Sequence, residues 1–424
     1  MSQGEFGAVD SFSLQDSLES ALAEDKLPTA LAYIFVNRIR ELGVSKSSGD
    51  FKRFKKAFKN GEGLGTVNLP LSKKRALQSG LSEEVFAARL REPVSSQEIN
   101  SYLEFFEEAA SNAIQKVVLH QAATHMKHLR EHSAEILEEH RAVRGVFINH
   151  LNGIWGRAID QFEVLVGIAR EVGDCALSFV NSDRSSELEG HKIEAMFQLY
   201  GRACHIGEEV SVLLANGLAD GAQARWRSLH EIQVVLKILC EGDEHLSQRY
   251  LEHHDIDLYL EAKATQLYGG SRLHSVHPDD LGLLSEVKDE LVGKYGKDFI
   301  CPYGWASELL GYKANRFSDL EKLAGAEYIR PFYKAASSSV HASSRGTQSR
   351  LGSPPNFDGV LSGSSSYGLF SPATGAAHSL VLAAVDIAQF SGSVDAMAMA
   401  ASMEKFSGSL NKSLERAFRV STAN

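Results

Sequence analysis

Between Ala222 and Leu239 the chain alternates apolar and polar residues at a helical period. The apolar positions recur at steps of three and four: Leu229, Ile232, Leu236 and Leu239. Such spacing predicts an amphipathic helix with one face against a core. Near its start lie four ionisable side chains: Arg225, Arg227, His230 and Glu231. Because an unpaired charge is too costly to bury, these side chains must face water or find partners.

Similar patterns predict helices along most of the chain. Residues 82–110 read as helical, with Ser95 and Glu98 at the spacing of a capping box. Residues 112–179 predict one or two long helices, broken near Gly145 or between Gly153 and Gly156. Further helices are expected at 186–215, in the segment containing Arg249 and Tyr250, and at 328–341, 377–391 and 393–418. Alternating β-branched runs are scarce, so we expect an all-α protein.

These elements suggest three regions. We expect an N-terminal helical region at 1–110, long connecting helices at 111–185, and a C-terminal helical bundle at 186–424. The polar stretch at 181–186 marks the boundary before the bundle. A Ser- and Gly-rich stretch at 343–376 predicts a long loop of the kind that flanks a site.

Charge and composition narrow the range of possible functions. The formal net charge of −10 excludes a general nucleic-acid coat, so a polyanion site must be a local patch. One patch is the segment 51–60, where phenylalanines share a helix face with five basic residues around them, including Lys52, Arg53, Lys55 and Lys56. The patch either contacts an RNA backbone or is the solvated face of a small amphipathic helix.

The remaining composition points to the cytoplasm. The four cysteines are scattered without a CxxC pair, which fits reduced thiols and gives no zinc-ribbon signal. The N-terminus lacks the pattern of a signal peptide. The apolar segment 378–390 is short and contains Asp386, so it predicts a buried helix and no membrane contact. No cofactor is expected.

Histidines on the long helical segment offer a candidate metal site. Four side chains share one face: His125, His128, His132 and Glu135. Imidazole and carboxylate at this spacing can hold a transition metal. However, no second element supplies a matching motif, so the solvated face of a helix is the favoured interpretation, and no metal ligand is assigned.

Two separated helices offer a stronger candidate for chemistry. Arg227 and Glu231 are four residues apart, and so are the members of a second line: Tyr333, Ser337 and His341. If the helices pack together, an arginine suited to phosphate meets a histidine suited to proton transfer. This combination fits metal-independent RNA cleavage by the 2′-hydroxyl. The alternative is a structural cluster that locks helix packing.

A pattern of Arg225 with His230 matches the Arg-x4–6-His motif of HEPN ribonucleases, but the same spacing recurs elsewhere in this chain. A longer set of residues resembles a bacterial family of unknown function, numbered 5677, over about residues 190–350. The set is Arg227-Ser-Leu-x-Glu231, Arg249-Tyr250, Trp305, Tyr328 and Tyr333-x3-Ser337-x3-His341. The resemblance implies a helical bundle similar to HEPN-like domains, with Arg227, Glu231, Ser337 and His341 in its polar core.

We therefore expect a HEPN-like, metal-independent ribonuclease or RNA-processing protein with a role in stress or phage defence. The catalytic residues would be Arg227, Glu231 and His341. The substrate-binding residues would be Tyr250, Trp305, Tyr333, Ser337 and Arg345, together with the basic face from Lys52 to Lys56. RNA and a second copy of the chain are the expected partners. The rival is a non-enzymatic scaffold, sensor or small-ligand-binding protein in which the same cluster is structural.

Overall fold

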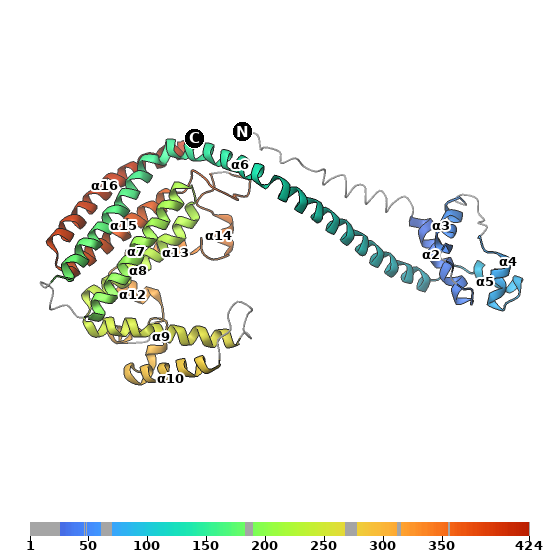
Figure 1. The fold of residues 1–424 in the computed structure, drawn as a ribbon, viewed down its shortest axis with the longest axis horizontal. Helices are drawn as coiled ribbons and strands as arrows, with labels where there is room; N and C mark the ends of the chain where they lie inside the picture. The colour runs from blue at the N-terminus through green and yellow to red at the C-terminus, as the bar shows by residue number, and fades with distance from the viewer. Residues whose placement is uncertain are drawn as a thin grey trace. The chain divides into compact units, whose positions relative to one another are not determined.

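The computed structural model describes residues 26–45, 47, 49–60, 70–182, 190–267, 278–311, 315–354 and 357–423 (Figure 1). None of these residues lies in a β-strand, and most are helical. The all-α helical class predicted from the sequence is confirmed. The chain divides into two compact units, Met1–Ile136 and Leu137–Asn424, whose boundary falls inside one long helix.

The N-terminal unit is built from short helices around a small core. Its elements are α2 (Lys26–Glu41), α3 (Asp50–Asn60), α4 (Lys73–Ala76), η1 (Leu77–Ser79), α5 (Glu83–Arg91) and the start of α6 (Ser96–Val180). The buried apolar residues of this core are Ala32, Ile39, Val44, Phe54, Phe58 and Phe86. A core this small gives the unit a modest hydrophobic driving force.

Two partly buried ion pairs reinforce this small core. Arg38 pairs with Glu98 and also donates to the carbonyl oxygens of Glu92 at 2.6 Å and Pro93 at 2.9 Å. Asp50 accepts from Arg75 Nη1 at 2.6 Å and from the Ser47 amide at 2.8 Å. These arginine partners, helped by backbone amides, lower the pKa of both carboxyl groups to about 2. The arginines thus tie loops to helices where apolar contacts are few.

The long helix α6 begins as the sequence predicts and is longer than expected. Ser95 Oγ accepts from the Glu98 amide at 3.2 Å, and Glu98 accepts from the Ser95 amide at 2.8 Å, which confirms the capping box. The predicted break near Gly145 or Gly153–Gly156 is wrong, because α6 runs unbroken to Val180. A glycine inside a helix costs only about 1 kcal/mol, which packing can offset.

The C-terminal unit is a helical bundle. Its helices are the end of α6, α7 (Gly190–Ala215), α8 (Ala219–Glu241), α9 (Glu244–Leu267), α10 (Pro278–Tyr295), α11 (Ser307–Leu310), α12 (Phe317–Leu323), α13 (Arg330–Ser337), α14 (Ser344–Gln348), α15 (Phe370–Ser391) and α16 (Val394–Ala423). Short turns of 3-10 helix lie between them: η3 (Lys297–Ile300), η4 (Gly304–Ala306) and η5 (Glu327–Ile329). Helices α7, α8 and α15 pack on one another, and α16 packs on α15 (Figure 1).

Several predicted boundaries within this unit were wrong. The expected loop at 343–376 contains α14, and α15 starts at Phe370, earlier than predicted. α15 is the only described helix that is long and apolar enough to cross a membrane, and 61% of its apolar window is buried inside the bundle. That burial is consistent with its position against α7, α8 and α16.

Candidate functional site

Helix α8 lies at the centre of the C-terminal unit and positions the candidate site. It packs against α7 and α15 along its length and against the short helices α12 and α13. Its four predicted core residues are all buried: Leu229, Ile232, Leu236 and Leu239. The amphipathic pattern of this helix is therefore confirmed, and three of its polar residues, Arg227, His230 and Glu231, lie where α12 and α13 approach.

Arg227, Glu231 and Tyr333 form the outer layer of the site. Arg227 Nε lies 3.2 Å from Glu231 Oε1, and the guanidinium stacks 4.9 Å above the Tyr333 ring centroid. The Tyr333 hydroxyl donates to Glu231 Oε1 at 2.5 Å. Burial and this hydrogen bond raise the pKa of Tyr333, so the phenol stays protonated. The Arg227 and Glu231 side chains are 24% and 37% exposed, so solvent reaches both of them.

A second, buried layer lies next to the first. His230 Nε2 lies 3.2 Å from Glu321 Oε1, and both side chains are 1% exposed. Glu321 also pairs with Arg330, whose guanidinium lies 5.4 Å from the Tyr333 ring centroid. Burial lowers the pKa of His230, while the hydrogen bond to Glu321 opposes that effect. This layer joins α8 to α12 and α13 through buried polar contacts.

Arg225 and His230 do not form one site, which removes support for the short HEPN-like motif. Arg225 pairs with Glu209 of α7 at 2.5 Å, whereas His230 faces α12. Residues five apart on a helix point in directions well over 90° apart, so this separation follows from helical geometry.

The predicted line of Tyr333, Ser337 and His341 is broken by the end of α13. The helix stops at Ser337, so the predicted helix from Tyr328 to His341 was wrong at its C-terminal end, while Tyr328 lies in η5, which leads directly into α13. Ser337 Oγ donates to the Tyr333 carbonyl at 3.1 Å, and the neighbouring Ser338 hydroxyl binds another carbonyl. Such serine contacts compete with helix continuation. His341 follows in a bend with an exposed side chain, and Arg345 is exposed on α14.

Tyr250 and Trp305 lie together in a different part of the bundle. Trp305 is buried and packs edge-on against half-buried Tyr250, with ring centroids 5.2 Å apart. The neighbouring Arg249 donates to the Trp305 carbonyl at 3.0 Å and pairs with Glu308 at 3.2 Å. The contacts of Arg249 and Tyr250 connect α9 to η4 and α11. The assignment of Tyr250 and Trp305 to substrate stays a prediction.

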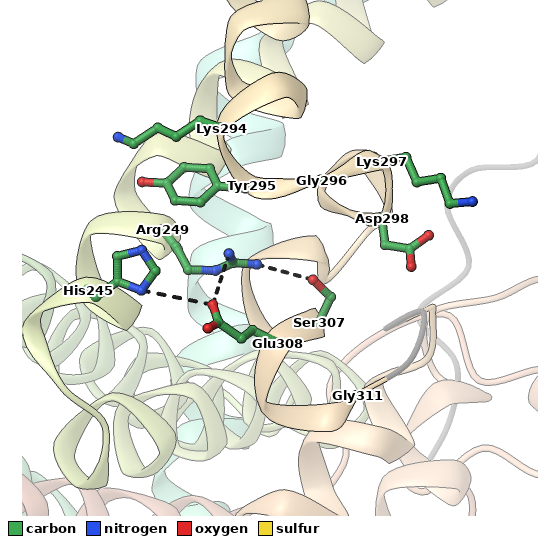
Figure 2. Close-up of a pocket in the computed structure, with 10 residues that line it drawn as sticks. All are labelled: His245, Arg249, Lys294, Tyr295, Gly296, Lys297, Asp298, Ser307, Glu308 and Gly311. Carbon is green, nitrogen blue, oxygen red and sulfur yellow. Dashed lines mark hydrogen bonds and ion pairs between the residues drawn. The ribbon is translucent and has the colours of Figure 1, made fainter.

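A polar pocket of about 550 Å³ opens beside Arg249. Figure 2 shows the Arg249 guanidinium between Tyr295 and Glu308, with Lys294 and Lys297 on opposite sides. Lys294 is paired with both carboxylate oxygens of Glu252 at 2.9 Å. Because Arg249 and Lys294 both have acidic partners, the pocket presents little unbalanced positive charge.

The basic face of α3 belongs to the N-terminal unit. Phe54 and Phe58 are buried as predicted, whereas Phe51 is 37% exposed and lies outside the core. Lys52 and Lys56 are exposed. Arg53 pairs with Asp50 at 2.9 Å, and Lys55 is half-buried. The four basic residues therefore differ in their access to a ligand.

The histidine face of α6 shows side-chain contacts without a metal cluster. His132 Nδ1 lies 2.9 Å from Glu135, and the rings of His128 and His132 are 4.6 Å apart. Within the described part of the chain, no group of three or more His, Cys, Asp or Glu side chains is arranged to hold a metal ion.

A family model matches the part of the chain that contains the site. Residues 194–359 match a family of unknown function (DUF5677). This match contains α8, α12, α13 and Arg249, and it confirms the family resemblance identified from the sequence. No curated protein and no solved structure matches the chain. These comparisons therefore name no activity for the DUF5677 region.

Sequence reasoning missed two members of the cluster, Glu321 and Arg330. They lie on separate short helices and share no helical spacing with Arg227 or His230. The only local signal was Pro331, which favours the first turn of a helix and marks the start of α13. Their roles became visible only through the packing of α12 and α13 on α8.

Proposed function

We propose that this protein is a cytoplasmic, RNA-binding protein that cleaves or processes RNA without a metal. The observation that supports it best is the solvent-accessible arginine of the DUF5677 region. Arg227 is held by Glu231 and stacked on Tyr333, and its side chain is 24% exposed. A planar guanidinium fixed in this way is preorganised to bind a phosphate through two hydrogen bonds.

In the proposed reaction, the RNA 2′-hydroxyl attacks the adjacent phosphorus. The new bond from the 2′-oxygen to phosphorus forms as the bond to the 5′-oxygen breaks, which leaves a cyclic phosphate and a free 5′-hydroxyl. Arg227 binds the phosphate and Glu231 orients Arg227. His341 takes the proton from the 2′-hydroxyl or supplies one to the 5′-oxygen, and water exchanges the other proton. Tyr333, Ser337 and Arg345 position the RNA.

Charge distribution supports an RNA partner. Residues 26–91 hold 14 Lys or Arg against 5 Asp or Glu, although the whole chain carries a net charge of −10. A basic segment within an acidic protein concentrates attraction for a polyanion in that segment. The exposed Lys52 and Lys56 of α3 lie in this segment.

The cleavage proposal is tested with purified full-length protein and total RNA, in the presence and absence of EDTA. We expect cleavage that resists EDTA and yields cyclic phosphate ends. Arg227→Ala and His341→Ala should each reduce the rate by about 100-fold or more. Arg225→Ala is the matched control, because Arg225 lies on the same helix and pairs with Glu209 instead. Cleavage that is unchanged in His341→Ala would refute the assigned role of this histidine.

RNA binding is tested separately with the basic face. Lys52→Glu combined with Lys56→Glu should weaken RNA binding about tenfold and reduce its salt dependence. Lys405→Glu with Lys412→Glu on α16 makes the same change in charge at exposed positions of the other unit. Equal losses in both double variants would indicate a general charge effect and contradict a local RNA-binding face.

A non-enzymatic role is the second candidate, and one observation favours it. Glu231 and Tyr333 bind each other, and His230, Glu321 and Arg330 are linked beside them. These contacts connect α8 with α12 and α13 and would serve a scaffold or sensor equally well. In that case Arg227→Ala would lower the unfolding temperature without changing RNA cleavage or binding. The same variant therefore separates the two functions.

A further inference from the structure

The middle of α6 carries an exposed stripe in which most positions are apolar. From residue 119 to residue 143, one face is formed at alternating steps of three and four: Leu119, Ala122, Met126, Leu129, Ser133, Ile136, His140 and Val143. Four of the apolar side chains remain largely open to solvent: Leu119 61%, Met126 48%, Leu129 50% and Val143 66%. A pattern that recurs every seven residues over more than three repeats is typical of the seam of a coiled coil.

An uncovered helix of this composition is poorly supported by its own backbone. Isolated helices are marginally stable in water, and most helices in proteins gain their stability by packing an apolar face. The stripe repeats every seven residues, not at the 3.6-residue period of a helix lying on a globular core. The period therefore favours a second helix as the partner.

We propose that the α6 stripe pairs with the same stripe of a second copy of this chain, forming an antiparallel two-stranded coiled coil centred near Glu131. In this register Leu119 meets Val143, and Met126 meets Ile136. The two remaining layers combine a small residue with a larger one, Leu129 with Ser133 and Ala122 with His140. In a parallel pair every layer would match identical residues, which brings Ala122, Ser133 and His140 each against its own copy. Alternating large and small residues fill a seam better, so the antiparallel arrangement is favoured.

Two of the residue pairs that flank the seam favour this register, whereas Arg130 and His132 each face their own copy. His125 lies opposite Glu139 of the second copy, an attractive pair when the imidazole is protonated. Val118 lies opposite Val146, and both are exposed in the single chain, at 58% and 72%. Arg130 meets its own copy at the axis, where a long side chain can extend into water. A two-fold axis through the helix makes the contact self-complementary, as symmetric dimers require.

Sedimentation equilibrium of the full-length protein tests the seam. We expect a monomer–dimer equilibrium in which Leu129→Glu raises the dimer dissociation constant at least about tenfold. Thr124→Glu is the matched control, because it adds the same charge on the opposite face of α6, and it should leave the constant unchanged. Leu129 is half-exposed in the single chain, so its substitution leaves the fold intact, and far-UV circular dichroism verifies this. Met126→Glu provides a second seam variant with the same expected loss.

Disulfide crosslinking tests the orientation. A mixture of Met126→Cys and Ile136→Cys chains should form a disulfide between the two variants, whereas each variant alone should crosslink poorly. Strong crosslinking of Met126→Cys with itself would indicate a parallel pair and overturn the proposed register. A protein that stays monomeric at all accessible concentrations, or a dimer insensitive to both Leu129→Glu and Met126→Glu, would overturn the proposal itself.

Discussion

Tyr333 shows how one side chain can serve both packing and chemistry. Its ring is buried and contacts the guanidinium groups of both Arg227 and Arg330, while its hydroxyl binds Glu231. The ring therefore holds α13 to the bundle, and the hydroxyl fixes the carboxylate that pairs with Arg227. Removing the hydroxyl alone separates these two contributions.

We predict that Tyr333→Phe lowers the free energy of unfolding by about 1–2 kcal/mol, because it removes a hydrogen bond to a charged group. Urea denaturation followed by tryptophan fluorescence measures the change. Tyr328→Phe is the control, since its hydroxyl binds His378 at an exposed position and its loss should change stability by less than about 0.5 kcal/mol. Equal effects of the two substitutions would contradict the buried role of the Tyr333 hydroxyl.

Asp386 is a buried carboxyl group whose negative charge has few stabilising partners. Its Oδ2 has no hydrogen-bond partner, and Oδ1 lies 3.6 Å from Lys237 Nζ. Burial raises its pKa to about 6, with Lys237 opposing the shift. The folded chain thus binds this proton more tightly than the unfolded chain does. The carboxyl group therefore makes stability fall as pH rises from about 4 to about 6, and the loss persists above that range.

We predict that Asp386→Asn increases the unfolding free energy at pH 7 by about 1–2 kcal/mol, because an amide replaces a poorly paired buried charge. The variant should also lose the decrease in stability between pH 4 and 6. Urea unfolding at several pH values measures both effects, with the exposed Asp358→Asn as control. A destabilised variant at pH 7 would show that the pairing with Lys237 outweighs the burial of the charge.

At the scale of elements, close helix packing depends on a small residue in α15. A Cβ added at Gly375 would lie 2.6 Å from Trp226 Cε2, so α15 approaches α8 where only glycine fits. The Trp226 indole also donates to Ser379 Oγ at 3.2 Å, which fixes the ring. This contact places α8, and with it Arg227 and Glu231, against the core of the bundle.

We predict that Gly375→Ala destabilises the C-terminal unit by about 1–3 kcal/mol through overpacking. Gly408→Ala on α16 is the matched control, because a Cβ there meets no atom within 4 Å. That substitution should stabilise the protein by about 0.5–1 kcal/mol, since alanine loses less backbone entropy than glycine. Thermal unfolding of both variants measures the difference, and equal shifts in the same direction would contradict the packing argument.

The sequence predicted helices better than it predicted their ends or their partners. Apolar periodicity identified α8 and its core face correctly, and Ser95 with Glu98 identified the start of α6. Internal glycines were poor evidence for a break, because a single glycine costs a helix only about 1 kcal/mol. At Gly173 of α6, a Cβ would lie 2.8 Å from Tyr200 of α7, so glycine there serves packing.

The candidate site could be predicted only in part, because sequence spacing links residues on one helix and does not link residues on different helices. Arg227 and Glu231 share one helix, so their spacing predicted their ion pair. Glu321 and Arg330 reach the site from two short helices, and no periodicity links them to α8. His341 was assigned to the Tyr333 line because a longer helix was assumed, whereas serine side chains end α13 at Ser337.

At the scale of the whole molecule, the two units differ in what stabilises them. The N-terminal unit has six buried apolar residues in its main core and relies on Asp50 and Glu98, while the C-terminal unit has a core several times larger. The carboxyl groups of Asp50 and Glu98 both have their pKa lowered to about 2 by arginine partners. Their contribution to stability is therefore complete above about pH 4.5 and is lost as the pH falls toward 2.

We therefore predict two separate unfolding transitions in acid. The N-terminal unit should lose structure first as the pH falls from 4.5 toward 2, because its ion pairs are protonated while the C-terminal core stays apolar and intact. All three tryptophans, Trp155, Trp226 and Trp305, lie in the C-terminal unit, so their fluorescence follows that unit alone. Hydrogen exchange of peptides from α2 and α3 follows the other. Coincident transitions by both measurements would show that α6 couples the units into one cooperative structure.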